Sequence, residues 1–492
     1  MHAFLDGLNT LLGVVTNFLY SWGLVFLLIG VGVGLTIYLG APQIRHIKAI
    51  FTSMKGSRHG AGSGISAFQA FAVGVATRVG IGNIGGVALA LIMGGAGAIF
   101  WMWVVAILGM ATAFAESTLA QIFKTQHADG TFRGGPAYYL AYGAGWKKMG
   151  ALFAVLTIFA SGMTVPMVQI NTVAATANAS HGIPTWVTAL IILVLIGPVI
   201  IGGVRGVART AEYLGPILAG VYIVITVVVI VMCLVTDPGR IGEAFARIFE
   251  GAFGLRAGAG GVAGAMFTAL ITGGRRGLFS NEAGLGTAPN AAGAATVAHP
   301  VSQGFIQALG VFVDTIIVCT CTALLILIAN PTLPTDPNLA GALTATSVAS
   351  ELGSWTAPLM TFIIFIFGYT SAFGAYSYGQ VCLDHMTKKP AYSIVYRIVV
   401  TLLCGLGAMA QLTLVWSLSD LMLGLAGIIN LIGLIVLAKW VKGALVDWRS
   451  QREAGVEVPL FVGRNNPNLP GDVTSGVWDE GHAASVAAQG GR

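Results

Sequence analysis

The stretch Ala76-Thr77-Arg78-Val79-Gly80-Ile81-Gly82-Asn83-Ile84-Gly85-Gly86 lies inside an apolar segment that is long enough to cross a membrane. Four glycines within seven residues disfavour a continuous helix, because glycine in a helix interior costs about 1 kcal/mol relative to alanine. A bilayer has no water to bond the backbone groups that a break frees, so irregular backbone occurs there only where protein or a polar cavity meets it. The stretch therefore predicts a broken membrane-spanning helix beside a polar cavity.

A second apolar segment has the same feature. About two hundred residues later it is interrupted by the stretch from Thr272 to Gly284, which reads TGGRRGLFSNEAG. Two interrupted spans at corresponding positions of two halves are typical of a transporter binding site. We therefore expect the two breaks to meet and to form one polar site halfway across the membrane.

The composition defines the class of protein. Hydrophobic residues make up 56% of the 492 residues and charged residues 9%, and the mean hydropathy is +0.83. Soluble domains carry about 25% charged residues, so we predict an all-α polytopic membrane protein with one membrane domain. The net charge of +6 lies in short loops rather than along one stripe, which argues against nucleic-acid binding. The chain has no H-E-x-x-H pattern and no nucleophile–base set at a shared depth, so we do not expect an enzyme.

Windows of about twenty apolar residues predict eleven membrane-spanning segments. The second and the seventh contain the two breaks. The predicted segments are Leu19–Tyr38, Phe68–Met93, Phe100–Phe123, Ala151–Val173, Thr185–Ile201, Leu214–Val235, Ala263–Ala291, Phe305–Ala329, Thr356–Tyr378, Ile394–Leu414 and Leu418–Leu437.

The basic residues orient these segments. They gather in alternate loops, such as residues 45–58 and 124–148, whereas the opposite loops carry only Arg240, Arg247 and Arg256. By the positive-inside rule, the N-terminus lies outside the cell and the C-terminus inside.

This orientation also divides the chain. The two broken spans run in opposite senses, and without the leading span the other ten form two halves of five, which is the inverted-repeat plan. We therefore expect an extra N-terminal span with a basic cytoplasmic loop in residues 1–66, a first repeat in 67–235, an external segment in 236–261, a second repeat in 262–447 and a flexible cytoplasmic tail in 448–492.

The breaks supply the candidate binding groups. An unwound turn frees N–H groups, which attract a carboxylate, and C=O groups, which coordinate sodium. Gly80 and Gly82 leave the backbone open to a ligand and Asn83 adds a side-chain amide, while Glu282 follows a Ser-Asn pair in the second break. The alternative is that the glycines only permit close helix crossing.

Five charged residues lie at membrane depth. Uncompensated charge there costs several kcal/mol, so we expect one or both of the carboxylates to pair with these arginines near a closed inner gate. The alternative is that the arginines extend to the cytoplasmic surface. The five residues are Arg78, Arg275, Arg276, Glu282 and Asp314.

Two further pairs of polar residues lie in apolar spans. The adjacent hydroxyls of Thr370 and Ser371 could complete a sodium site, because hard cations prefer oxygen ligands, or could bond the preceding helical turn. Gln169 and Asn171 follow a proline, and could face a central cavity or join neighbouring helices.

The chain resembles a known family, the alanine or glycine:cation symporters of bacteria and archaea, also called sodium:alanine symporters. The resemblance runs from the first span to about Lys442. It is carried, in family order, by the runs GIGNIGGVALALIMGGAGAIFWMWVVAILGMATAFAES, GGPAYYL, MVQINTVA, RRGLFSNEAGLGTAPNAA, HPVSQG and GVFVDTIIVCTCTALLIL.

The resemblance implies a leucine-transporter-like architecture, with ten core spans in two inverted repeats and one extra leading span. It implies that the two breaks hold the carboxylate and amine of an amino acid. The substrate-binding residues implied are Thr77, Gly80, Gly82, Asn83, Gln169, Asn171, Phe279, Ser280 and Asn281. The sodium ligands implied are the carbonyls of Ala76 and Val79 and the hydroxyls of Thr370 and Ser371.

The chain departs from the family pattern near this site. Ile81 replaces a threonine, and Ala375 and Gln380 replace a tryptophan and a glutamate. If the tryptophan walls the substrate pocket, Ala375 makes the pocket larger. We therefore expect a substrate side chain larger than that of alanine or glycine.

The function expected from the resemblance is sodium-coupled symport of a small neutral amino acid into the cell. The expected partners are the amino acid, Na⁺ as coupling ion and membrane lipid, with no organic cofactor, no nucleic acid and no predicted oligomeric state. The expected location is the bacterial or archaeal cytoplasmic membrane. The alternatives are a proton-coupled amino-acid transporter, an ion channel, and an amino-acid sensor that moves nothing.

Overall fold

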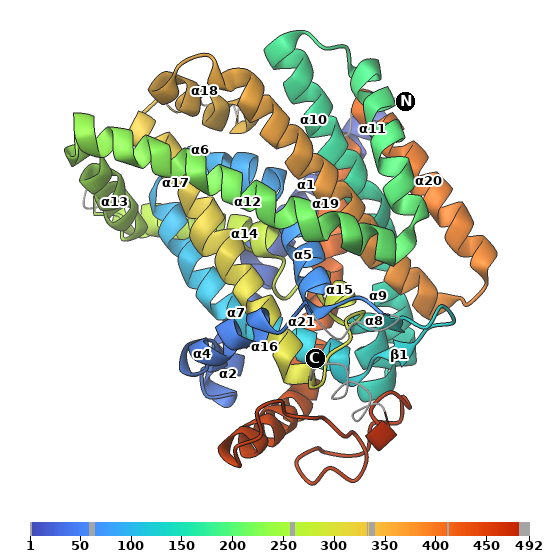
Figure 1. Ribbon diagram of the computed structural model, residues 1–492. Coiled ribbons are helices and arrows are strands. Elements are labelled where there is room, and N and C mark those ends of the chain that lie inside the picture. Colours follow the sequence, from blue (N-terminus) through green and yellow to red (C-terminus); the bar gives the residue numbers. More distant parts are fainter. Residues whose placement is uncertain are drawn as a thin grey trace.

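The computed structural model describes residues 2–58, 64–255, 261–331, 333, 340–410 and 413–481, and these form an almost entirely helical bundle (Figure 1). The only strands among them are β1 (Thr125–Gln126) and β2 (Phe132–Arg133), an antiparallel pair in one loop. Arg256 of the predicted external segment and residues 482–492 of the predicted tail lie outside the described residues.

The first half of the bundle contains the helices up to residue 252. Several of them are interrupted by π-helical turns, labelled η, and π-bulges often mark functional sites. The elements are α1 (His2–Phe18), η1 (Leu19–Leu24), α2 (Val25–Tyr38), α3 (Pro42–Arg45), α4 (Ile47–Lys55), α5 (Ala67–Arg78), η2 (Gly82–Gly86), α6 (Val87–Gly94), α7 (Gly97–Ile122), α8 (Pro136–Tyr138), η3 (Tyr139–Gly143), α9 (Lys147–Phe159), η4 (Ala160–Thr164), α10 (Val165–His181), α11 (Thr185–Ile201), α12 (Gly203–Thr236) and α13 (Gly239–Ala252).

The second half has the same character. Its elements are α14 (Val262–Asn281), α15 (Pro289–Ala292), α16 (Pro300–Val311), η5 (Phe312–Cys319), α17 (Thr320–Ala329), α18 (Ala340–Leu352), α19 (Thr356–Met386), α20 (Pro390–Met409) and α21 (Thr413–Glu453).

Eight helices in the described part of the chain are long and apolar enough to cross a membrane, and the bent pair α5 and η2–α6 forms a ninth candidate. The remaining two predicted segments are also helical: α11 is an apolar helix of 17 residues, and α14 has 20 residues. Large apolar side chains such as Val235 and Ile201 are exposed on the outside of the bundle, as expected for a surface in contact with lipid. The protein is thus a polytopic membrane protein. The eleven crossings and the inverted repeat stay predictions.

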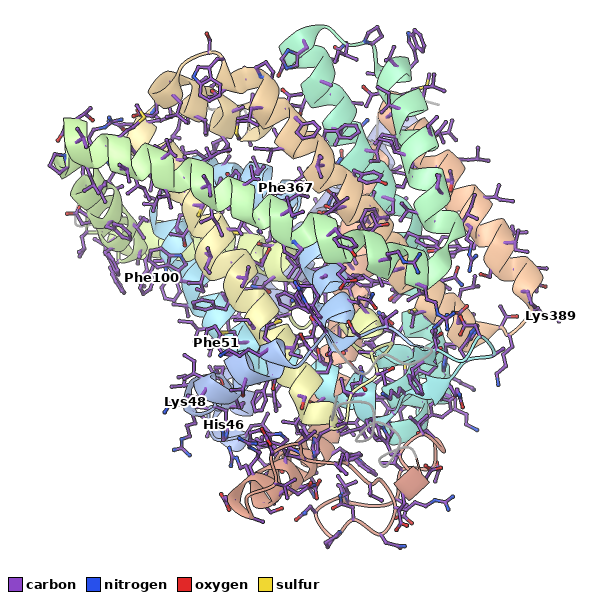
Figure 2. All side chains as sticks on the ribbon, in the orientation of Figure 1. His46, Lys48, Phe51, Phe100, Phe367 and Lys389 are labelled. Atoms are coloured by element: carbon purple, nitrogen blue, oxygen red, sulfur yellow. The ribbon has the colours of Figure 1, made fainter. Side chains whose placement is uncertain are left out.

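The core lies between helices that are distant in sequence. Phe367 of α19 is fully buried, and its ring lies 5.8 Å from that of Tyr222 on α12, which crosses over α19 (Figures 1 and 2). Lys48 and Lys389 lie exposed at the edge of the bundle (Figure 2). Figure 1 shows α4, β1 and the C-terminal segment at one end of the molecule, and α18 and the N-terminus toward the other.

The first break occurs where the glycines predict it. α5 begins with a capping box, in which Ser66 and Gln69 each bond the other's backbone N–H, and it ends at Arg78. Val79 then leaves the helical region, and the helix axis bends by 51° before the π-helical turn η2.

The second break is displaced from its predicted position. α14 is continuous through Gly273 and Gly274, and it ends only at Asn281. Glu282 is in the left-handed region with φ of 56°, and the chain stays non-helical until α15. The prediction that the interruption begins at Thr272 is wrong. The two glycines serve close packing instead, since a Cβ at Gly273 would lie 2.2 Å from the carbonyl oxygen of Ala98.

The C-terminal segment also differs from expectation. α21 continues to Glu453, past the predicted boundary at residue 448, and residues 454–481 fold back on the bundle. Trp478 is 2% exposed, and its indole N–H donates to the carbonyl of Gln121 at 2.9 Å. The described part of the tail is therefore packed rather than free, because its apolar side chains are buried against the helices.

Candidate functional site

The site is a cavity of about 620 Å³ beside the first break. Its walls come from the first broken helix, from α10, from α14 with the chain that follows it, from α18 and from the start of α21. Of the residues implied as substrate-binding, six line this cavity: Thr77, Gly80, Gly82, Gln169, Asn171 and Phe279.

Asn83, Ser280 and Asn281 lie behind the wall rather than in it. All three side chains are fully buried, and none lines the cavity. The Asn83 amide donates to Ser280 Oγ at 3.1 Å, and so joins the first break to the last turn of α14, just before the second break. Asn281 Oδ1 accepts from the backbone N–H of Ala283 at 3.0 Å, which stabilises the turn at the end of α14.

Asp314 is the centre of this buried polar cluster. Its carboxylate accepts hydrogen bonds from Asn83 at 2.6 Å and from Ser280 and Thr315 at 2.7 Å each. All three donors are uncharged, and Asp314 is fully buried in the turn η5. Within the described residues, no basic side chain lies within 4 Å of this carboxylate.

The predicted pairing of carboxylates with arginines is wrong for the described residues. Glu282 accepts a hydrogen bond from Thr287 at 2.9 Å, and Arg78 donates to Gln307 at 3.3 Å. The ion pair of Arg275 is with Asp420, at 3.7 Å. Asp420 was missed, although an acidic residue in an apolar span is itself a signal.

The implied sodium ligands are partly brought together. Ser371 Oγ donates to the carbonyl of Thr77 at 2.9 Å and lies 3.4 Å from that of Ala76. A Cβ at Gly80 would lie 2.1 Å from the same hydroxyl, so the unwound chain and α19 touch at this point. Thr370 instead bonds the carbonyl of Phe367 in its own helix, which is the alternative that its position left open.

Asn171 both lines the cavity and joins helices, whereas Ala375 is not at the expected position. The Asn171 amide donates to the carbonyls of Gly407 and Ala410, both at 2.8 Å, and so joins α10 to the end of α20. Ala375 is 1% exposed and does not line the cavity, so it does not enlarge the pocket. Ile81 does line it, and replaces a hydroxyl with an apolar wall.

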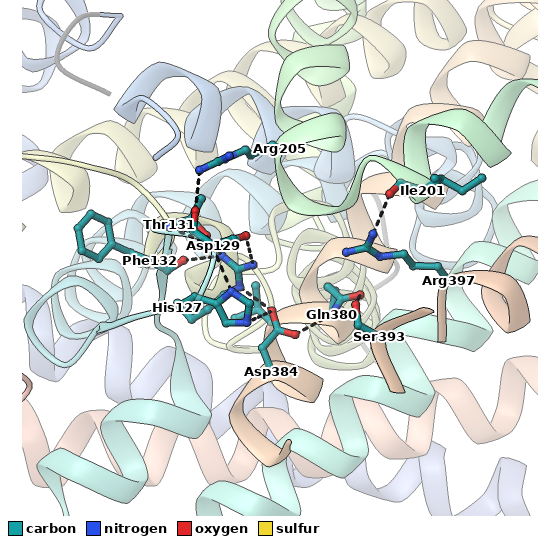
Figure 3. Close-up of polar contacts among 12 residues, drawn as sticks. His127, Asp129, Thr131, Phe132, Ile201, Arg205, Gln380, Asp384, Ser393 and Arg397 are labelled. Carbon is teal, nitrogen blue, oxygen red and sulfur yellow. Dashed lines mark hydrogen bonds and ion pairs between the residues drawn. The ribbon is translucent and has the colours of Figure 1, made fainter. Parts of the chain in front are cut away.

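A network of buried charges closes the other end of α19 (Figure 3). The Arg133 guanidinium donates to Asp384 at 2.6 Å, and the two side chains are only 5% and 7% exposed. Gln380 donates to the other oxygen of Asp384 at 2.7 Å. The departure from glutamate at position 380 thus supplies a donor where a second carboxylate would repel the first.

Asp129 adds to this network from the loop between β1 and β2, 3.5 Å from Arg133. Burial alone would raise the pKa of the Asp129 carboxyl. Hydrogen bonds from the Thr131 side chain and backbone, together with the Arg133 charge, hold that pKa below its usual range. The Asp129 carboxylate therefore keeps its charge at neutral pH.

Glu116 supports the second break from behind. It is fully buried, lies 3.3 Å from the backbone nitrogen of Gly284 and accepts from the Asn430 amide at 3.0 Å. Asn430 also donates to the carbonyl of Gly284 at 3.0 Å. Both backbone groups of an unwound residue are thereby satisfied away from water, as a membrane requires.

Comparison with known proteins identifies the family of this chain. Residues 5–462 match the model of the sodium:alanine symporter family. The chain belongs to the sodium:alanine symporter family. A probable sodium/glutamine symporter, GlnT of Bacillus subtilis, is 42% identical over 456 residues, which cover 92% of this chain and 93% of GlnT.

Two more members of the sodium:alanine symporter family extend the comparison. The amino-acid carrier protein AlsT of Bacillus subtilis is 37% identical over 96% of this chain and 98% of its own length. The sodium/alanine symporter AgcS of Methanococcus maripaludis is 36% identical over 87% and 94%. The chain is therefore a membrane transporter of the sodium/amino-acid symporter class, and not an enzyme.

Proposed function

We propose that this protein couples the influx of Na⁺ to the uptake of a neutral amino acid, in a size range from alanine to glutamine. The names of AgcS and GlnT give those two amino acids as the substrates of relatives. The cavity of about 620 Å³ has room for either side chain. Ile81, Val165 and Val168 line it with apolar surface, and Gln169 adds an amide.

The observation that carries the proposal is the Asp314 cluster. Only uncharged groups donate to this fully buried carboxylate, and among the described residues it has no ion-pair partner within 4 Å, so a bound cation would offset the cost of its burial. Oxygen ligands from a carboxylate and hydroxyl groups suit Na⁺ as a hard cation. Asn83 links this cluster to the break that lines the cavity. The ion site and the substrate site would therefore be connected through Asn83.

A second cation position is supported by the contact of Ser371 with the first break. The carbonyls of Ala76 and Thr77 both point to this hydroxyl. In the proposal, Na⁺ bound here joins α19 to the unwound chain. The Thr370 hydroxyl and the Val79 carbonyl are proposed as further ligands of this Na⁺.

The amino-acid head group is proposed to bind the unwound turn, where Gly80, Gly82 and Phe279 line the cavity. The N–H and C=O of Gly80 bond Asn83 in this structure, so Gly80 would have to exchange these bonds for the substrate's. The inner network of Arg133 and Asp384 lies about 20 Å along α19 from Ser371, by the rise of 1.5 Å per residue. With the N-terminus outside and the C-terminus inside, this network closes the cytoplasmic side while the cavity is reached from outside.

Uptake into proteoliposomes tests the proposal. The full chain is reconstituted and offered labelled alanine, glutamine, glycine and leucine, with an inward Na⁺ gradient, an inward proton gradient or neither. The expected result is saturable uptake of alanine or glutamine that depends on Na⁺. Uptake driven by protons alone contradicts the sodium coupling. Binding without uptake indicates a sensor, and unsaturable ion flux indicates a channel.

A further inference from the structure

The face of α14 that lines the cavity carries Arg276 and Phe279, and Glu282 lines the cavity just after the helix ends. Residues three apart on a helix lie on one face. At 1.5 Å per residue, Arg276 stands about 7 Å before the end of α14 at Asn281, where the second break begins. Arg276 therefore lines a part of the cavity that is separate from the second break.

This outer part lies between the break and the surface. The same part of the wall contains Trp416 and Asp420 of α21. Trp416 is 42% exposed, so the cavity approaches the surface there. An amino acid that enters past Trp416 reaches the level of Asp420 and Arg276 before it reaches the unwound chain at Gly80.

The two adjacent arginines have different surroundings. Arg275 is held in place: it donates to Asn17 at 2.8 Å, pairs with Asp420 at 3.7 Å and lies over the ring of Tyr20. Arg276 lies 6.0 Å from the ring centroid of Phe279, and among the described residues its guanidinium has no hydrogen bond and no ion-pair partner within 4 Å.

The charge balance of this region favours an anion. Arg275 pairs with Asp420 from outside the cavity wall, so the positive charge of Arg276 is left without a direct counter-ion in this part of the wall. A guanidinium without a partner at this depth is costly, and a carboxylate that it can bind with two parallel hydrogen bonds offsets that cost.

We propose that Arg276 binds the α-carboxylate of the incoming amino acid in the outer part of the cavity, with Asp420 facing the ammonium group. This subsite precedes the site at the two breaks and selects zwitterions before the ions and substrate are enclosed. The inference rests on the proposed amino-acid transport. It makes Arg276 a substrate-binding residue rather than one that only holds a gate closed.

The test compares Arg276→Gln and Arg276→Lys with the unchanged full chain in proteoliposomes, by initial rates of Na⁺-driven alanine or glutamine uptake. We expect Arg276→Gln to raise KM about tenfold or more, with the maximal rate within about twofold. Arg276→Lys keeps the charge but cannot form two parallel hydrogen bonds to a carboxylate. Its KM should therefore lie between that of the unchanged chain and that of Arg276→Gln. Since the maximal rate is measured in the same experiment, it also shows that each variant is folded.

Two comparison variants sharpen the test. Arg247→Gln makes the same chemical change at a surface pair with Glu243, and should leave both parameters unchanged. Arg275→Gln should change KM less than Arg276→Gln does, because Arg275 does not line the cavity.

An unchanged KM in Arg276→Gln, or a lower maximal rate at unchanged KM, overturns the proposal and indicates a gate. If Arg276→Gln does not fold, the KM of Arg276→Lys decides by the same criterion. If the unchanged chain takes up no amino acid, the proposed function fails first, and this outcome is seen before any variant is measured.

Discussion

The side-chain amide of Asn83 donates to the carboxylate of Asp314 at 2.6 Å, across 231 residues of sequence. One partner belongs to the first break and the other to the turn η5. The bond therefore couples the backbone that faces the cavity to a buried negative charge. If a cation binds that charge, it also fixes the geometry of the break, which is a physical route from ion binding to substrate binding.

The first prediction concerns this charge. Asp314→Asn removes the negative charge but keeps the size of the side chain, and we expect the Na⁺ concentration for half-maximal uptake to rise at least about thirtyfold, or Na⁺ stimulation to disappear, because charge-assisted contacts of this kind are worth about 2 kcal/mol or more. Uptake is measured over a range of Na⁺ concentrations. Asp237→Asn, at an exposed position, is the matched control. An unchanged Na⁺ dependence in Asp314→Asn would falsify the assignment of the cation to this cluster.

The second prediction concerns the contact between the first break and α19. In Gly80→Ala the new Cβ would lie 2.1 Å from Ser371 Oγ, so either the hydroxyl or the unwound chain must move. We expect transport to fall at least about tenfold while the protein is still produced and monodisperse. Gly86→Ala is the control, since a Cβ there meets nothing within 4 Å. Equal activity of the two variants would show that the contact of Gly80 with Ser371 has no role.

Some of these relationships could be predicted from the sequence and some could not. The four glycines around Gly82 disfavour helix strongly enough to place the first break. Gly273 and Gly274 look equally disruptive, yet they pack against Ala98 and Val25 in a continuous helix, because tight helix crossing also selects glycine. Sequence alone does not separate these two uses.

The candidate site shows the same limit. Six of the implied substrate residues line the cavity, because they lie on the break or on the faces that cover it. Asn83 and Ser280 lie behind the wall, since their amide and hydroxyl are drawn to Asp314. Which carboxylate an amide or an arginine meets depends on the packing of helices hundreds of residues apart, so the pairing of Arg275 with Asp420 could not be predicted.

The third prediction concerns the inner network. Removing one member of a buried ion pair costs about 3–5 kcal/mol, so Asp384→Asn should favour opening of the cytoplasmic side. Cys382 lies fully buried two residues before Asp384, and its rate of alkylation should rise about tenfold or more. Mass spectrometry identifies the labelled cysteine. Arg247→Ala, which breaks an exposed pair with Glu243, should leave the rate unchanged. Equal labelling in both variants contradicts the role of the network.

The fourth prediction is a pH dependence of the same network. The pKa of Asp129 is held below its usual value of about 4, so the folded state gains stability from its charge at all pH values above that figure. This contribution is lost as the pH falls through the lower, folded-state pKa. Asp129→Asn should therefore lower the melting temperature at pH 7, and the difference from the unchanged chain should shrink in strongly acid buffer. A difference that grows on acidification contradicts the sign of the shift.

The last prediction concerns the packed C-terminal segment. Trp478 is almost fully buried, its ring centroid lies 4.5 Å from the Lys124 ammonium and 5.2 Å from the ring of Phe461, and its N–H bonds Gln121. Truncation of a buried aromatic side chain costs about 3–5 kcal/mol, and here it also uncovers a lysine that has no carboxylate within 4 Å in the described part of the chain. Trp478→Ala should therefore lower the melting temperature in detergent by several degrees. Trp355→Ala, at a position 68% exposed, should change it by about one degree or less. If both variants melt alike, residues 454–481 do not hold the end of α7 to the rest of the bundle, and the packing of the segment adds no stability.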